Sequence, residues 1–233
     1  MPVVTISAQY GAGAIDVGRY VAGELTLHYV DQSVLVDADR ELGVTVSRVA
    51  SKDERTDSLR ERIGHFLQRA LERSAAGGQV DPMLGAANLE VMLAQTYQEM
   101  ADGDVPGIVD DRAFRQAATR IIEELAEAGD VVILGRGSQM ILRDLPGATH
   151  VQLVAEESIR AARVMEWEGL SEEDALGQMR KSTRGRAAFH KKFWKVDVWD
   201  PRLYDLVINT SKLSFETAGN LIVEVARASA QAS

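Results

Sequence analysis

The chain has 233 residues, a formal net charge of -9 and 45% hydrophobic residues, a balance typical of a globular protein with one sizeable domain. Its acidic total argues against a general nucleic-acid-binding surface, so we expect no nucleic-acid partner. The absence of cysteine excludes disulfides and thiolate sites, and the four histidines lack metal-ligand spacing, so no side-chain metal site is expected. No apolar run approaches the roughly 20 residues of a spanning helix, and no secretory signal is recognisable, so we expect a cytoplasmic protein without membrane partners.

The first part of the chain predicts a βαβ unit. Residues 2–6 form a short β-branched run typical of a buried strand. A glycine-containing turn at 8–13 follows, and helical spacing of apolar residues predicts a helix with Asp16 as its N-cap. A second strand at 28–31 ends in Asp31. Strand, glycine turn, helix and strand in this order indicate a parallel sheet with helical crossovers.

The remaining elements complete an α/β pattern. Residues 51–128 are predicted to be mostly helical, and the final helix is predicted to start near Ser214. A helix is also expected at 157–168, and Ser171 opens a capping pattern for the next one. Three more strands are predicted at 131–134, 149–154 and 206–208. The sequence therefore predicts one domain over residues 1–233 with a three-layer α/β fold, in which helices cover both faces of a parallel five-stranded sheet.

The turn after the first strand is the first candidate site. A phosphate loop uses glycines to point backbone N–H groups at phosphate oxygens, at the N-terminus of a helix. The segment at 7–16 has this strand-to-helix context. However, Ala8, Ala14 and Ile15 replace the first glycine, the lysine and the hydroxyl residue of the G-x-x-x-x-G-K-[ST] pattern. A tight structural turn is an equally good interpretation of this segment alone.

Two single residues lie where ligands bind in open α/β sheets, just past predicted strands. Arg136, between Gly135 and Gly137, offers a bidentate fork for a phosphate; the alternative is an ordinary surface arginine. Asp31 could hold a ribose hydroxyl or a water on magnesium, and it could equally cap the next helix.

A basic run is the third candidate. Residues 175–195 contain no acid and seven basic residues: Arg180, Lys181, Arg184, Arg186, Lys191, Lys192 and Lys195. This segregation of charge suits a segment that closes over polyphosphate and neutralises the transferring group. Arg160 and Arg163 could extend the cluster from the preceding helix. A solvated basic face and a nucleic-acid contact are the alternatives.

In this order, the motifs resemble the cytidylate kinase-like family over nearly the whole chain. The motifs are Val4 to Gly13, Asp31, Leu134 to Gly137, Leu170 to Ala175, Arg184 to Ala187 and Leu203 to Ser211. The resemblance implies a P-loop nucleoside monophosphate kinase that moves the γ-phosphoryl of ATP, with Mg²⁺, to CMP or another small monophosphate.

The resemblance also implies roles for individual positions. A helical acceptor-binding region would lie at about 40–112 and a basic lid at about 156–200. Arg136 and Asp31 would bind the acceptor. The implied catalytic arginines are Arg184, Arg186, Arg160 and Arg163, and the implied ATP-binding residues are Tyr10, Gly11, Ala12, Gly13, Ala14 and Asp16. The central helices could also join two copies of the chain.

The chain departs from the family pattern at several of these positions. Ala14 replaces the loop lysine of authentic cytidylate kinases, and Ile15 replaces an arginine common in the cytidylate kinase-like family. Gly137 replaces an aspartate that helps select cytosine, and Ser182-Thr183 stands where an acid is usual. A degenerate kinase that binds nucleotides without efficient turnover is therefore the alternative function. Arg19, one turn into the first helix, is a candidate substitute for the lysine.

Overall fold

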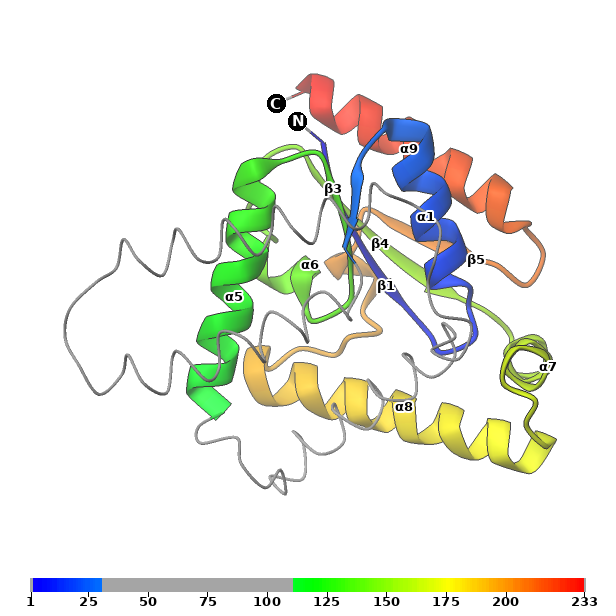
Figure 1. The fold of residues 1–233 in the computed structure, drawn as a ribbon. Coiled ribbons are helices and arrows are strands. Elements are labelled where there is room, and N and C mark those ends of the chain that lie inside the picture. Colours follow the sequence, from blue (N-terminus) through cyan, green and yellow to red (C-terminus); the bar gives the residue numbers. More distant parts are fainter. Residues whose placement is uncertain (1, 31–110, 233) are drawn as a thin grey trace.

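A computed structural model describes residues 2–30 and 111–232 (Figure 1). Asp31 and the predicted helical region at about 40–112, apart from its last two residues, lie outside the described residues. The described strands form one sheet in the order β2-β3-β1-β4-β5, and each of its pairings is parallel. The strands are β1 (Val3–Ala8), β2 (His28–Val30), β3 (Val131–Leu134), β4 (Ala148–Val154) and β5 (Leu206–Asn209). The predicted parallel five-stranded sheet is confirmed.

Helices follow the strands as βαβ connections require. They are α1 (Ala14–Leu25), α5 (Asp111–Ala128), α6 (Ser138–Ile141), α7 (Glu157–Glu168), α8 (Glu172–Trp194) and α9 (Phe215–Ala232), with a 3₁₀ turn η1 (Pro201–Leu203). The Ser171 cap is confirmed, because its hydroxyl accepts a hydrogen bond from the Asp174 N–H at 3.2 Å. The prediction that Asp16 caps α1 is wrong: the N-cap is Gly13, and Asp16 lies in the first turn.

Alternate residues of the buried strands supply the cores on the two sides of the sheet. Val4 and Ile6 of β1 pack with Val17 of α1 and Ile222 of α9. On the opposite face, Val3 belongs to a cluster that includes residues 121, 122 and 125 of α5. Helices therefore cover both faces, as the sequence predicts.

The second face is polar where β1 and β4 meet. Thr5 and Ser7 of β1 are in register with His150 and Gln152 of β4, and all four side chains are buried. Thr5 Oγ1 and His150 Nδ1 are 2.8 Å apart, within hydrogen-bond distance. Buried polar groups carry a desolvation cost, so a polar layer inside a sheet core indicates a functional or specifying role.

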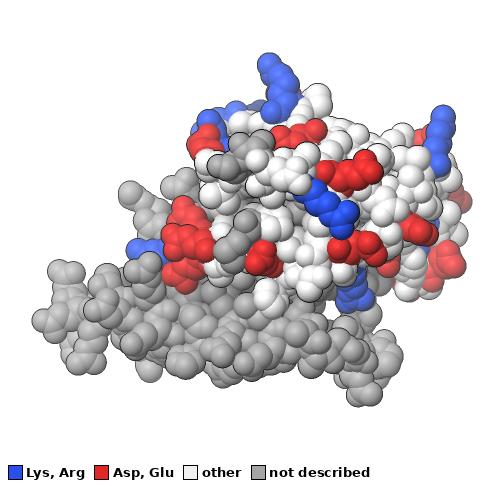
Figure 2. All heavy atoms as spheres, turned by 90° about the horizontal axis from the view of Figure 1, so that it is seen from above, with Lys and Arg blue, Asp and Glu red and all other residues white. Residues whose placement is uncertain are grey.

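Charge does not segregate on the face at the amino ends of the strands. Figure 2 shows this face from above, with Lys, Arg, Asp and Glu side chains interspersed on the residues that the structure describes. The candidate site residues belong to the opposite edge, where β1 and β3 end.

Candidate functional site

Helix α8 links the two candidate loops at the carboxyl edge of the sheet. Near its start, Ala175 and Met179 pack with Tyr10 of the loop after β1. At its end, the Trp194 ring lies so close to Gly137 that a Cβ there would come within 2.4 Å of it. Ligands of open α/β sheets bind along this edge. The basic run therefore crosses the edge between the phosphate-loop candidate and the Arg136 turn (Figure 1).

The loop after β1 requires glycine at two positions. Gly11 and Gly13 have φ angles of +82° and +85°, in the left-handed region that favours glycine. A Cβ on Gly11 would lie 2.8 Å from the Arg160 carbonyl oxygen, and one on Gly13 would lie 2.2 Å from the Phe215 ring. The loop is therefore wedged between the first turn of α7 and the start of α9.

Three successive carbonyls of this loop accept hydrogen bonds from side chains of α7 and of the segment after β5. The Arg160 guanidinium donates to the Tyr10 carbonyl at 3.3 Å, and Arg163 donates to the Gly11 carbonyl at 3.3 Å. The Thr210 hydroxyl donates to the Ala12 carbonyl at 2.9 Å. In a trans peptide, C=O and the next N–H point in opposite directions. The N–H groups of residues 11 and 13 are therefore directed away from α7 and β5.

The remaining loop amide closes the turn itself. The Ala12 N–H donates to the Gln9 carbonyl at 2.9 Å, and the Gln9 side-chain oxygen accepts from the Ala155 N–H at 3.0 Å. Ala14 then begins α1, whose first N–H groups and dipole favour an anion. The loop thus has the backbone arrangement of an anion site, and Ala14, which is buried, adds no cation to it.

Arg163 is tied to the segment after β5. It donates to the Thr210 hydroxyl at 3.1 Å and to the Thr210 carbonyl at 2.7 Å. Its guanidinium carbon lies 4.7 Å from the centre of the Phe215 ring. Burial lowers the pKa of Arg163, and the charge of Asp16 partly opposes this effect. The guanidinium group of an arginine is effectively always charged in proteins.

Arg160 is the more deeply buried of the two, with 7% of its surface exposed. Its Nε–H donates to the Ala155 carbonyl at 2.9 Å, in addition to its bond with the loop. Burial lowers its pKa, while the charge of Glu157 raises it. Arg160 and Arg163 were expected to act at the start of a lid; in the structure their guanidinium groups lie behind the phosphate-loop candidate.

Tyr10 joins the loop to the hairpin of α7 and α8. Its hydroxyl donates to the Glu168 carboxylate and lies 3.1 Å from the Gln178 side-chain oxygen. Burial raises the pKa of Glu168, and the hydrogen bonds from Tyr10 and Gln178 lower it. The Tyr10 ring is itself buried, so this residue anchors the hairpin.

Arg136 is not a surface arginine, since only 3% of it is exposed. It occupies the middle of a turn in which Gly135, Arg136 and Gly137 have φ angles of +71°, +55° and +70°. Such a conformation is costly for a non-glycine residue and is characteristic of functional sites. The alternative of an ordinary surface position, left open by the sequence, is wrong.

The two predicted lid arginines differ in exposure. Arg184 is exposed, whereas Arg186 is half-buried and its Nη1 atom is buried with no hydrogen-bond partner among the described residues. The Arg186 carbonyl accepts from His190 Nδ1 at 2.9 Å, and His190 Nε2 accepts from the Gln139 amide at 2.9 Å. Burial lowers the pKa of His190 to about 4, so this imidazole is neutral at pH 7. Within α8 the Phe189 and Trp194 ring centres are 5.4 Å apart, and the Trp194 ring lies against Gly137.

Sequence reasoning missed several residues around this edge. Thr210 and Phe215 contact the loop. Thr210 lies inside the motif at 203–211, where it received no role, and Phe215 had no signal beyond its position after the last strand. Gln139 and Gln152 are each 2% exposed, and both amide atoms of Gln152 lack a hydrogen-bond partner in the described part of the chain. The signal for Gln152 was a polar residue inside the strand predicted at 149–154, and no predicted element covered Gln139. Arg19, the proposed lysine substitute, lies with its guanidinium 5.7 Å from the Tyr29 ring centre, beside β2.

Within residues 2–30 and 111–232, no group of three His, Cys, Asp or Glu side chains could hold a metal ion. No helix in these ranges is long and apolar enough to cross a membrane.

The fold and the loop geometry together define a parallel α/β protein with a strand–glycine turn–helix candidate phosphate loop, the class that contains nucleotide kinases. Residues 3–212 match the model of the cytidylate kinase-like family, and the chain belongs to that family. The resemblance inferred from the motifs is confirmed.

The individual relatives share only part of the sequence with this chain. A cytidylate kinase of Methanocaldococcus jannaschii is 31% identical over 102 residues, which cover 42% of this chain and 57% of that protein. A protein of Corynebacterium glutamicum named uronate isomerase is 33% identical over 113 residues, covering 47% of this chain and 21% of that protein. The chain thus spans less than two thirds of the length of these curated relatives. A solved structure of an uncharacterized protein from Eubacterium ventriosum shares the fold, with a TM-score of 0.61, 18% identity, and coverage of 97% of this chain and 99% of that one.

Proposed function

We propose that the protein is a nucleotide kinase that transfers the γ-phosphoryl of ATP, with Mg²⁺, to CMP or another small monophosphate in the cytoplasm. The single observation that carries this proposal is the loop at residues 9–13. Its carbonyls accept hydrogen bonds from α7 and Thr210. The Gly11 and Gly13 N–H groups point the other way, and a helix begins directly after the loop. Preorganised N–H donors at a helix N-terminus suit polyphosphate.

The residues present fit ATP better than they fit a protein-held metal. The loop offers N–H groups for phosphate oxygens, but Ile15 has no oxygen where a P-loop hydroxyl ligand would stand. Mg²⁺ commonly keeps several waters and binds through phosphates and one or two carboxylates. When bound, Mg²⁺ would neutralise charge on the phosphates of ATP, which themselves would supply much of its coordination.

In this proposal each group has a separate task. Gly11 and Gly13 bind ATP phosphates through their N–H groups, with Tyr10, Ala12, Ala14 and Asp16 lining the loop. Arg184 and Arg186 neutralise charge on the transferring group, and Arg136 holds the acceptor monophosphate, with Asp31 also on the acceptor side. An acceptor oxygen forms a bond to the γ-phosphorus while the bond to the bridging oxygen breaks, and ADP leaves.

A coupled ADP-release assay across the common nucleoside monophosphates tests this function. Arg136→Ala and Arg184→Ala serve as controls, and each should reduce kcat/KM by at least about tenfold, since removing a charge-assisted contact costs about 1.5–3 kcal/mol. Turnover no higher than that of these variants, with every acceptor tried, would overturn the proposal.

One observation favours the second candidate, a nucleotide-binding protein without efficient turnover. Ala14 is 6% exposed and Ile15 half-buried, so the place of the loop lysine holds only apolar groups. Because phosphoryl transfer depends on charge stabilisation, loss of this cation can remove much of the rate while binding survives. Calorimetry that detects ATP binding by a chain with no ADP release would support this candidate, and rapid turnover would exclude it.

A further inference from the structure

The loop lysine is missing, and two arginines of α7, the buried Arg160 and the half-buried Arg163, bring positive charge to the loop instead. Arg160 and Arg163 lie on successive turns of α7, behind the loop rather than in front of it. Neither touches the N–H edges that face a phosphate, so neither is placed as a catalytic residue. Arg160 nevertheless connects to one of those N–H groups through a single peptide group, and Arg163 connects to the other through the Thr210 hydroxyl and a peptide group.

The first connection runs from Arg160 to Gly11. The Arg160 guanidinium donates to the Tyr10 carbonyl at 3.3 Å, and the same peptide group carries the Gly11 N–H on its other side. A cation on the carbonyl polarises the amide, which makes its N–H a stronger donor.

The second connection runs from Arg163 to Gly13 through a hydroxyl. Arg163 donates to Thr210 Oγ1 at 3.1 Å, and this hydroxyl donates in turn to the Ala12 carbonyl at 2.9 Å. That peptide group carries the Gly13 N–H. Hydrogen bonds in such a chain strengthen one another, and they do so more in a buried setting. Thr210 has no exposed surface, and Arg163 is half-buried.

We propose that Arg160 and Arg163 act as positioning residues that replace the loop lysine electrostatically, by polarising the Gly11 and Gly13 N–H donors toward a bound polyphosphate. The inference rests on the proposed function, because it requires that the loop binds phosphate. It differs from a purely structural role in one respect: the positive charge matters, and not only the shape of the side chain.

Arg163→Gln and Arg163→Lys separate charge from shape. Glutamine keeps a hydrogen-bond donor and loses the charge, while lysine keeps the charge and loses the planar fork. Inorganic tripolyphosphate and ATP are the probes, with Kd measured by calorimetry at two salt concentrations. We expect Arg163→Gln to weaken the binding of both probes by at least about tenfold and to reduce the salt dependence of their Kd. Arg163→Lys should recover most of the affinity.

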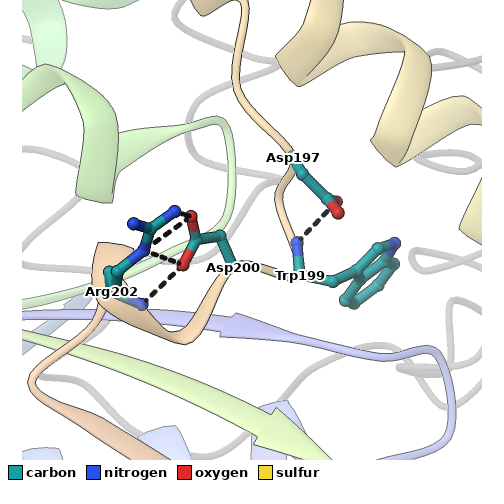
Figure 3. Close-up of polar contacts among 4 residues, drawn as sticks. All are labelled: Asp197, Trp199, Asp200 and Arg202. Carbon is teal, nitrogen blue, oxygen red and sulfur yellow. Dashed lines mark hydrogen bonds and ion pairs between the residues drawn. The ribbon is translucent and has the colours of Figure 1, made fainter.

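The matched control is Arg202→Gln. Arg202 lies in η1, at the amino end of β5, and pairs with the Asp200 carboxylate at 2.7 Å (Figure 3). Its side chain is 87% exposed and belongs to the opposite edge of the sheet, so this variant should bind both probes as the wild type does. It removes the same charge from the whole protein, which corrects for the effect of net charge.

Thr210→Ser and Thr210→Val form a second pair, useful if Arg163→Gln does not fold. Serine keeps the hydroxyl that relays to Ala12, and valine removes it at nearly equal volume. We expect serine to retain affinity and valine to lose it, with circular dichroism and thermal melting used to verify folding of each variant.

The outcomes distinguish this inference from the proposed function. Tripolyphosphate binding by the wild type and an equal Kd for folded Arg163→Gln and Arg202→Gln would overturn the inference alone. So would an equal loss in Arg163→Lys and Arg163→Gln, or equal binding by Thr210→Ser and Thr210→Val. A wild-type chain that binds neither tripolyphosphate nor ATP would overturn the proposed function and this inference with it.

Discussion

The Thr210 hydroxyl, one residue past β5, donates to the Ala12 carbonyl at 2.9 Å, across 198 positions of the sequence. This bond ties the last strand to the loop that follows the first strand, and Arg163 joins it from α7. The loop conformation is therefore set by elements from both ends of the chain. Substitutions at these contacts should report on the loop before any ligand is added.

Gly13→Ala should destabilise the protein. Its φ of +85° is unfavourable for alanine, and the new Cβ would come within 2.2 Å of the Phe215 ring. We expect a loss of about 1–3 kcal/mol in the free energy of unfolding, measured with urea. Gly23→Ala, in α1 with nothing within 4 Å of the added Cβ, should instead gain about 0.5–1 kcal/mol. Equal effects of the two substitutions would contradict the described loop.

Tyr10→Phe should loosen the hairpin of α7 and α8. The variant leaves the partly buried Glu168 carboxylate without the donor that the Tyr10 hydroxyl supplies. We expect a loss of about 1–2 kcal/mol and faster amide hydrogen exchange in the first half of α8. Tyr20→Phe is the matched control, because the Tyr20 hydroxyl donates to Asn220 at an exposed site, and its effect should stay within about 0.5 kcal/mol. Unchanged exchange in α8 would argue against Tyr10 as its anchor.

Gln152→Met should stabilise the protein without ligand. Gln152 is 2% exposed, and neither amide atom has a hydrogen-bond partner among the described residues, so an apolar side chain of similar size removes a desolvation cost. We expect a gain of about 1 kcal/mol in the free energy of unfolding. Gln139→Met, at a position equally buried but bonded to His190, should lose a similar amount. Destabilisation by both variants would show that Gln152 is satisfied in solution.

Acid should destabilise the fold through His190. Burial lowers the pKa of this imidazole from 6.5 to about 4, so below pH 6.5 the unfolded chain binds a proton that the folded protein does not. Stability from this group is present above pH 6.5 and is lost as the pH falls toward 4. The pKa of His150 is also lowered by burial, which adds a contribution of the same sign.

His190→Gln is expected to flatten this dependence. Urea unfolding measured between pH 4 and pH 7 should give a smaller slope of unfolding free energy for the variant than for the wild type, with a residual slope from His150. Identical slopes for the two proteins would contradict a neutral, buried His190 in the folded state.

Much of the fold follows from the sequence because its signals are local. The strand at 131–134 and the helix at 157–168 have the predicted bounds, and the Ser171 cap depends on residues one turn away. α6 was missed because four residues are too few to show a helical period. The prediction of Asp16 as the N-cap is wrong because Gly13, in a left-handed conformation, is the N-cap and α1 begins at Ala14. Composition alone does not reveal that conformation.

The sequence by itself determined the chain order of the five strands and of the longer described helices, the glycines of the loop and the segregation of basic charge along α8, since each depends on neighbours in the chain. Only the tertiary structure decided what those residues do to one another. It buried Arg136 and placed Arg160 and Arg163 behind the phosphate-loop candidate. It also brought Thr210 and Phe215 against residues about 200 positions away. The reason is physical: guanidinium and hydroxyl groups take their roles from the carbonyls and rings that packing brings within about 3–5 Å, and no spacing in the sequence encodes that.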